Sequence, residues 1–249
     1  MNWAKIKSIM IIFLIIINIF LVIVLGITTY RENNIPDEVT KAAAELLEKS
    51  GFPCDESIIP DMYVRTSNIT AEFLSANELG EIFFGKEMAF KTDGNSLVAE
   101  EGSAKLIVED NFFVYETGRS KSETSGRKLA ALLTKKGIGM KNAVYDKKNE
   151  CFYMMYKNCN LFNMYIIAEA DSNGELSYVR AQWPKIYPSP IKKRISFMES
   201  LSKVPEKFSE KGEIKRIEFG YAMKAVPGGV YVFRPSWRVT AGNETQIIE

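Results

Sequence analysis

The chain has 249 residues, of which 46% are hydrophobic and 25% charged, and it contains no histidine. These proportions are those of a folded globular protein, and the missing imidazole excludes Ser-His-Asp triads, zinc sites with histidine ligands and histidine-ligated haem. With 32 basic and 31 acidic residues the net charge is +1, so no global field favours binding to nucleic acid.

The most apolar part of the chain is residues 9–27, a run of 19 residues that only Asn18 and Gly26 interrupt. As a helix with a rise of about 1.5 Å per residue, the run measures about 28 Å, close to the roughly 30 Å hydrocarbon core of a bilayer. Inserting its apolar side chains gains on the order of 5 kcal/mol. A cleaved signal peptide, the alternative, has an apolar region of about 7 to 15 residues and a small-x-small cleavage site. The run therefore predicts an uncleaved transmembrane helix.

Basic residues flank this helix on one side. Lysines at positions 5 and 7 precede it, whereas one arginine and one glutamate follow it and cancel. By the positive-inside rule, residues 1–8 are predicted to stay in the cytoplasm and residues 31–249 to lie outside the cell. The sequence thus predicts a single-pass protein of the cell membrane.

Asn18 is the one polar side chain amid this apolar stretch. On a helix it shares a stripe with six apolar residues. The stripe consists of Ile11, Leu14, Ile15, Asn18, Leu21, Val22 and Leu25. An amide in lipid gains about 0.6 to 2 kcal/mol from a partner on another helix, so the stripe is a candidate contact with a partner's transmembrane helix. The alternative, a tolerated asparagine without a partner, stays open because insertion scales allow one.

The region after the anchor starts with helical patterns and continues with extended ones. Pro36-Asp37-Glu38 opens a helix predicted over 37–50, residues 58–66 look extended, and a second helix is predicted over 75–84. Four alternating segments separated by Asp-Gly and Glu-Gly turns then predict an antiparallel meander. These segments lie near 87–92, 96–100, 104–109 and 112–116.

The same order, a helix followed by strands, occurs again. A helix is predicted over 122–136, ending at Gly137, and Ser172-Asn173-Gly174 predicts a hairpin turn between two of the strands that follow. These strands lie near 142–146, 150–157, 161–169 and 175–182. A third helix near 191–203 and two strands near 213–223 and 229–240, joined by Pro227-Gly228-Gly229, complete the pattern.

The predicted fold class is α+β, an N-terminal transmembrane helix followed by an exported region of two similar helix-plus-antiparallel-sheet lobes. The lobes are residues 31–118 and 119–249. At an offset of 86, residues 42–52 match residues 128–138 at five positions, which taken alone is weak evidence for duplication because short helix ends of this kind arise by chance.

No complete set of catalytic, cofactor-binding or metal-ligating residues is apparent. The S-x-x-K pattern of serine-lysine enzymes occurs three times without its companion motifs, which indicates coincidence. Adjacent carboxylates such as Glu100 and Glu101 point to opposite faces of a strand and do not form a hydrolytic pair. Asp171, Asn173 and Glu175 imitate the start of a calcium loop, but a plain hairpin turn is favoured. The protein is predicted not to be an enzyme and to need no cofactor.

The three cysteines, Cys54, Cys151 and Cys159, are too few for a disulfide framework. Cys151 and Cys159 flank a predicted bend and could pair, which would leave Cys54 free. Three thiols, or at most one bridge, are the alternatives that the sequence leaves open.

The opening Met1-Asn2-Trp3-Ala4-Lys5-Ile6-Lys7, followed by a spanning run that contains Asn18-Ile19-Phe20-Leu21, resembles the start of the YycI family. Four later segments, and the order of helix and strands, are similar to features of that family. These segments are Gly51-Phe52, Ile59-Pro60, Glu218-Phe219-Gly220-Tyr221 and Pro235-Ser236-Trp237-Arg238-Val239. The resemblance covers most of the length, closely at both ends and loosely in the middle.

The resemblance implies a bitopic regulator of the cell-wall two-component system of low-GC Gram-positive bacteria, and a duplicated α/β arrangement outside the cell. The implied partners are a sensor histidine kinase of the WalK type, also called YycG, a YycH-like protein and membrane lipid. Nucleic acid is not among them, and a homodimer stays open. The alternative is a membrane-tethered, PepSY-like module that binds the wall or inhibits a protease, in which the anchor serves only as a leash.

Overall fold

The computed structural model describes residues 3–227 and 230–249. Met1 and Asn2 of the resemblance, and Gly228 and Gly229 of the predicted turn, lie outside the described residues. The chain divides into two compact units. Unit 1 comprises Met1–Thr66, Lys193–Ile217 and Val239–Ile248, and unit 2 comprises Ser67–Lys192, Glu218–Arg238 and Glu249.

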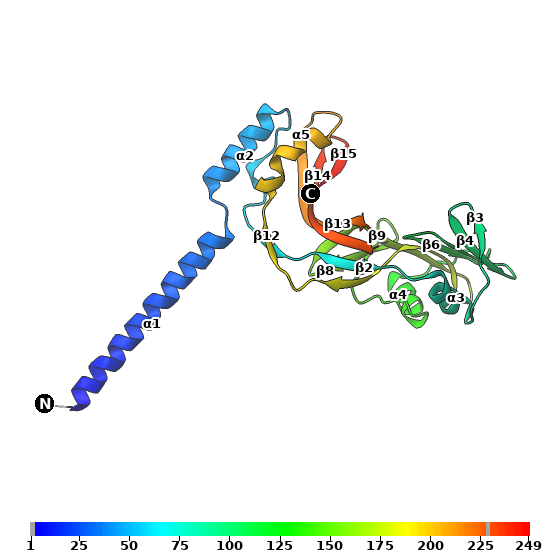
Figure 1. Ribbon diagram of the computed structural model, residues 1–249, viewed down its shortest axis with the longest axis horizontal. Helices are drawn as coiled ribbons and strands as arrows, with labels where there is room; N and C mark the ends of the chain where they lie inside the picture. Colours follow the sequence, from blue (N-terminus) through cyan, green and yellow to red (C-terminus); the bar gives the residue numbers. More distant parts are fainter. Residues whose placement is uncertain (1–2, 228–229) are drawn as a thin grey trace. The chain divides into compact units, whose positions relative to one another are not determined.

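The first helix, α1, is the apolar N-terminal helix, and an α/β region rich in antiparallel strands follows it (Figure 1). The five α-helices of the described residues are α1 (Trp3–Asn33), α2 (Asp37–Lys49), α3 (Ala76–Phe84), α4 (Gly126–Lys135) and α5 (Val204–Lys207). Two 3-10 helices, η1 (Glu56–Ile58) and η2 (Phe197–Lys203), accompany them. The predicted helices over 37–50 and 75–84 are thus confirmed, and the one predicted over 122–136 begins later, at Gly126.

Local chemistry explains where α3 begins. The side chain of Ser75 accepts a hydrogen bond from the backbone N–H of Glu78, and the Glu78 carboxylate accepts one from the backbone N–H of Ser75. This reciprocal capping box satisfies two donors that a helix start otherwise leaves unpaired. Gly85 ends the helix in the left-handed conformation with φ 73°, which glycine adopts without strain.

The strands of unit 2 form one mixed sheet in the order β11-β2-β14-β13-β9-β10-β6-β5-β4-β3, with β8 also paired to β9 and β7 to β8. Residues of β13 and β14 are divided between the two units. The bounds are β2 (Ile69–Glu72), β3 (Lys91–Asp93), β4 (Ser96–Glu101), β5 (Ala104–Val108), β6 (Phe113–Glu116), β7 (Ala143–Asp146), β8 (Cys151–Tyr156), β9 (Cys159–Ala170), β10 (Leu176–Gln182), β11 (Lys185–Pro188), β13 (Ile214–Val226) and β14 (Val230–Ala241). The pairing of β13 with β9 is parallel, whereas β2 pairs antiparallel with β11 and β14, β10 with β6 and β9, and β8 with β7 and β9. The pairs β3–β4, β4–β5 and β5–β6 are antiparallel as well.

The predicted meander is confirmed, except that its first strand, predicted near 87–92, is the shorter β3 (Lys91–Asp93). β3, β4, β5 and β6 pair in sequence as antiparallel neighbours. Gly94 and Gly102, in the turns that the Asp-Gly and Glu-Gly pairs predict, have φ 60° and 61°. Glu100 and Glu101 lie on β4 and form separate ion pairs with Lys105 and Lys86.

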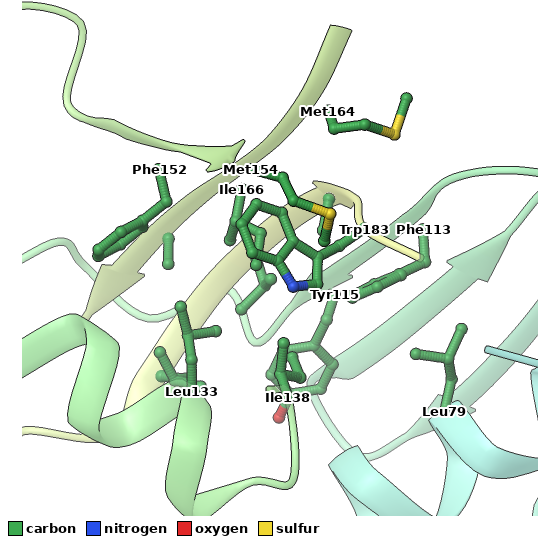
Figure 2. Packing of buried hydrophobic residues seen from close by; sticks show 14 of the residues in the cluster. Leu79, Phe113, Tyr115, Leu133, Ile138, Phe152, Met154, Met164, Ile166 and Trp183 are labelled. Atoms are coloured by element: carbon green, nitrogen blue, oxygen red, sulfur yellow. The ribbon is translucent and has the colours of Figure 1, made fainter. Parts of the chain in front are cut away.

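The core of unit 2 lies between one face of this sheet and the helices α3 and α4. Phe83 of α3 stacks on Tyr115 of β6 with ring centroids 4.3 Å apart, and Leu133 of α4 is fully buried. Figure 2 shows Leu79 and Leu133 on the helices and Met154, Ile166 and Trp183 among the residues that they share the core with. Burial alternates along β5, β6 and most of β9 and β10, which places about every second side chain of these strands in this core.

Unit 1 contains α1, α2, α5, η1, η2, β1 (Val64–Thr66), β12 (Lys193–Ile195) and β15 (Glu244–Ile248). β1 and β12 form a separate two-stranded antiparallel sheet. The buried faces of its helices include Leu47 of α2, and Phe52 packs against Phe208 with ring centroids 5.5 Å apart. This packing gives unit 1 its own apolar core.

The prediction of a third helix near 191–203 is wrong for the first part of that range. Residues 193–195 form β12 because β1, a segment distant in sequence, pairs with them. The helical spacing is real only from Phe197 onwards, where the chain forms η2 and then α5, with a proline in its first turn. The strands β2, β11 and β15 were not predicted.

The predicted boundary between residues 118 and 119 lies within unit 2. β6 and β10, one on each side of that boundary, are antiparallel neighbours in the same sheet. The division into two similar lobes stays a prediction.

The predicted hairpin turn at Ser172-Asn173-Gly174 is confirmed, and Asp171 organises it. The Asp171 carboxylate accepts hydrogen bonds from the backbone N–H groups of Asn173 and Glu175 and pairs with the Arg119 guanidinium at 2.9 Å. These interactions lower the pKa of Asp171 below its ordinary value of 3.8. The hydrogen bond from the Glu175 N–H has the largest effect, and the one from Arg119 comes second. The residues that imitate a calcium loop are therefore engaged in the turn itself.

Replacing Asp171 with asparagine is expected to make the free energy of unfolding less dependent on pH in acidic solution. A carboxyl group whose pKa is lower in the folded state stabilises the fold above its unfolded pKa, and this contribution is lost as the pH falls through the folded value. The stability difference between wild type and Asp171→Asn should therefore be present at neutral pH and shrink below about pH 4. Thermal unfolding of the full chain in detergent between pH 3 and 7 measures this, and a difference that does not change with pH would refute it.

Candidate functional site

The apolar helix α1 carries the predicted partner-contact stripe. The segment Met10–Tyr30 is long and apolar enough to cross a membrane, and a signal sequence near an N-terminus meets the same criterion. The six apolar side chains of the stripe are between 52% and 69% exposed, so no other part of the described chain covers them. These residues are Ile11, Leu14, Ile15, Leu21, Val22 and Leu25. Their role in partner contact stays a prediction.

The amide of Asn18 already makes one hydrogen bond within α1. Its Nδ2 donates to the backbone oxygen of Leu14 at a distance of 2.9 Å. This bond lowers the cost of placing the amide in lipid, and it leaves the Oδ1 acceptor and the second N–H for a partner. The structure therefore fits both a tolerated asparagine and a moderate helix–helix contact.

The end of α1 is connected to the following part of unit 1 through a short, hydrogen-bonded junction. The Asn33 oxygen accepts a bond from the Tyr63 N–H at 3.0 Å, Asn34 forms an antiparallel bridge with Met62, and the Ile35 N–H donates to Asp61 at 2.6 Å. Ile35 is 4% exposed, and Pro36 then directly precedes α2. We call residues 33–35 and 61–63 the junction.

The junction contrasts with a flexible linker. Flexible tethers are rich in glycine and serine, fully solvated and without hydrogen-bonded partners. Here the chain passes from the last residue of α1 to α2 through three residues, one of them buried and two of them bonded to the neighbouring segment. The end of α1 is therefore bonded directly to the segment that precedes β1.

The three cysteines are thiols in the structure. Cys159 lies opposite Tyr156 across the β8–β9 pair, five positions from Cys151 along β8. At about 3.3 Å per residue, this offset amounts to about 16 Å, whereas a disulfide requires Cα atoms within about 7 Å. Bridging Cys151 to Cys159 is therefore excluded in this register. Burial raises the pKa of Cys54 and of Cys159 above the ordinary value of 9.0.

Unit 2 contains cavities that are large enough for a small ligand. One of about 650 Å³ is lined by Tyr115, Arg119, Lys135 and Lys136, among others, and one of about 560 Å³ lies beside Lys121. Several of these cations are engaged. Arg119 pairs with two carboxylates, Lys121 pairs with Glu150 at 3.3 Å and Glu169 at 3.0 Å, and Lys136 donates to a backbone oxygen. Because these cations already have partners, the charge of the lining residues does not indicate which class of ligand either cavity would bind.

The described residues contain no group of three or more carboxylate or cysteine side chains placed to hold a metal ion. In the part of the chain that the structure describes, buried polar side-chain atoms all have hydrogen-bond partners. The orphaned buried donor or acceptor that often marks a ligand site is therefore missing from those residues.

Comparison with known proteins does not assign the chain to a family. No protein-family model matches the sequence, and no curated protein matches it either. Among solved structures, the chain is similar to an uncharacterized protein from Eubacterium rectale, with a TM-score of 0.42 and 12% identity, over 79% of this chain and 85% of that one.

Sequence reasoning found the stripe on α1 but missed the junction. The stripe is visible because its residues recur at helical spacing. Met62 and Tyr63 carry no such signal, because their contact with residues 33 and 34 forms only once the chain has folded back on itself.

Proposed function

We propose that this protein is a single-pass membrane regulator of a sensor histidine kinase in a cell-wall-related two-component system. The kinase is of the WalK (YycG) type, and a YycH-like protein acts with it. The contact is made by the stripe around Asn18, packed against the kinase's transmembrane helices. The resemblance to the YycI family suggests this partner, and the junction at the end of α1 is the observation that supports signalling over simple attachment.

A regulator shifts a kinase only if it binds the kinase's signalling states with different free energies. A stripe on α1 supplies such a contact inside the membrane, and the hydrogen-bonded junction gives an external event a way to change the orientation of the stripe. A helix on a flexible leash would bind both states regardless of what the exported part senses.

The proposal includes the topology and domain organisation that the sequence predicts. The N-terminus lies in the cytoplasm, residues 9–27 cross the membrane, and residues 31–249 lie outside the cell as two similar lobes. The two lysines before α1 support this orientation by the positive-inside rule.

A second candidate function is a membrane-tethered wall-binding or protease-inhibiting module. The cavity of about 650 Å³ in unit 2, with Tyr115 and Lys135 among its lining residues, favours it because a binding module needs a concave site. In this case α1 only attaches the protein to the membrane, and its sequence is irrelevant beyond its length and hydropathy.

Exchanging residues 9–27 for an unrelated spanning helix separates the two functions. We expect the exchange to abolish capture of the kinase by the full-length protein and to change the output of a kinase-dependent reporter. The single change Asn18→Leu should weaken capture about 3- to 30-fold, which corresponds to about 0.6 to 2 kcal/mol for an interhelical amide contact.

The matched control is Phe13→Leu, an exposed position of α1 outside the stripe. It should leave capture unchanged. Retained capture and retained reporter output after the helix exchange would overturn the regulatory proposal and favour the leash. Unchanged capture by Asn18→Leu alone would overturn the assignment of the contact to the stripe.

A further inference from the structure

The cavity of about 650 Å³ in unit 2 is lined by a tyrosine whose hydroxyl group has no protein partner. Tyr115 of β6 is 7% exposed, and its ring stacks on Phe83 and meets Phe84 edge to face. Within the part of the chain that the structure describes, its hydroxyl group makes no hydrogen bond. Fully enclosed polar side-chain atoms of the described residues all have partners, so this hydroxyl group is not enclosed by protein and opens into the cavity. We call this space the Tyr115 cavity.

The hydroxyl group of Tyr115 lies near charges of both signs. Burial raises the pKa of Tyr115 above its ordinary value of 10.0, while Arg119 lowers this pKa and Glu175 raises it further. The group therefore keeps its proton at neutral pH and can both donate and accept a hydrogen bond. Arg119 and Glu175 pair with each other at 2.8 Å and line the same cavity.

The lining of the Tyr115 cavity offers hydrogen-bond donors and acceptors together. Both ion pairs of Arg119 are formed by its Nη1 atom, which leaves the other N–H groups of the guanidinium for a ligand. Lys135, near the end of α4, is exposed and forms no ion pair with any described residue. The carboxylates of Glu101 and Glu175 each accept from one cation and keep further lone pairs.

This mixture favours an uncharged ligand. The lining contains two acidic side chains, Glu101 and Glu175, and three basic ones, Arg119, Lys135 and Lys136. An anion in the cavity would meet the carboxylates, and a cation would meet the basic groups. Each hydroxyl group of a polyol is both a donor and an acceptor, so it can bond to residues of either sign.

We propose that the Tyr115 cavity binds an uncharged, hydroxyl-rich ligand of the sugar class, with the Tyr115 hydroxyl group donating to one of its oxygens. The volume fits, since small-molecule sites occupy about 300 to 1,000 Å³. Leu132 and Leu176 in the lining provide apolar surface for the C–H groups of a sugar ring. The inference deepens the second candidate function, the tethered binding module, and does not rest on a contact between α1 and a kinase.

The test is isothermal titration of the full-length protein in a polyoxyethylene detergent, which carries no sugar. The uncharged probes are glucose and N-acetylglucosamine. Glucuronate and glucosamine are their anionic and cationic counterparts, and cyclohexanol is a ring with a single hydroxyl group. We expect at least one uncharged sugar to bind at millimolar concentration, about threefold or more tightly than the charged counterparts and cyclohexanol, as one or more additional hydrogen bonds predict.

Tyr115→Phe should weaken sugar binding about 2- to 10-fold, because it removes one hydrogen bond between uncharged groups. Without ligand, this variant should be at least as stable as wild type, since the hydroxyl group that it removes has no partner in the protein. Lys135→Ala should also weaken binding, because it removes a donor. The matched controls are Tyr178→Phe, on the opposite face of the sheet, and Lys128→Ala on α4, neither of which lines the cavity. Both controls should bind as wild type does.

The possible failures are distinct. If neither sugar binds, or if glucuronate or glucosamine binds more tightly than the uncharged probes, the assignment of the cavity to sugars is overturned. A Tyr115→Phe protein that is less stable than wild type would show that the hydroxyl group already has a partner, which would also overturn it. None of these results concerns α1, whose role the helix exchange tests, so they leave the regulatory proposal unchanged.

Discussion

Replacing Gly220 with valine is expected to destabilise the protein by about 3 kcal/mol or more, the upper part of the range for overpacking a core. Gly220 lies on β13 opposite Asn160 of β9, in the parallel pair. A Cβ atom at this position would lie 2.5 Å from the backbone oxygen of Asn160 and 2.5 Å from the ring of Phe162. Real Cβ atoms essentially never come so close, so the backbone or the ring must move.

The ring cannot move easily because it is held on another side. Phe162 is 2% exposed, and the Arg238 guanidinium lies over it, 4.8 Å from its centroid. Two hydrogen bonds of 2.9 and 2.6 Å fix this guanidinium to the carboxylate of Glu218. The substitution therefore strains the pairing of β13 with β9 directly.

Chemical unfolding of the full-length protein in detergent, followed by the fluorescence of the buried tryptophans, measures the effect. The matched control is Gly139→Ala, since a Cβ at Gly139 meets nothing within 4 Å and φ there is not in the left-handed region. This control should change the free energy of unfolding by less than about 0.5 kcal/mol. A Gly220→Val protein as stable as the control would contradict the packing described for this strand pair.

Inserting Gly-Ser-Gly-Ser after Tyr30 is expected to disconnect the exported part from the kinase. The insertion leaves the spanning segment Met10–Tyr30 and the junction intact but breaks the helical connection between them. Allosteric coupling free energies are typically about 1 to 3 kcal/mol, so the ratio of reporter output between signal states should fall about 5- to 150-fold. Capture of the kinase should persist because the stripe is unchanged.

A helical insertion of seven residues at the same place is the matched control. Seven residues make nearly two full turns, so the phase of α1 changes by only about 20°. The control should keep most of the regulation. If the flexible insertion regulates as well as the wild type does, the junction transmits nothing and α1 is a leash.

Elements with local causes could be predicted from the sequence. The apolar run alone gives α1, since its side chains have no need of a tertiary partner within the chain. Ser75 and Glu78 cap α3 through contacts within one turn, and Asn173-Gly174 closes its hairpin over four residues. These interactions connect neighbours in sequence, so composition and spacing are enough to reveal them.

Pairings between distant segments could not be predicted. Residues 193–195 were expected to be helical, and only the pairing with residues 64–66 makes them a strand. The parallel pairing of Gly220 with Asn160 likewise leaves no periodic signal in either segment. A strand's partner is chosen by the packing of the whole chain, because a backbone donor of an extended segment has no partner nearby in the sequence.

The same distinction applies to the candidate site. The sequence by itself determined that residues 9–27 form an apolar helix with a single amide, Asn18, since hydrophobicity and helical spacing are properties of contiguous residues. Only the tertiary structure decided what the helix is attached to, because the Tyr63 N–H reaches the oxygen of Asn33 through a hydrogen bond that joins segments far apart in the chain.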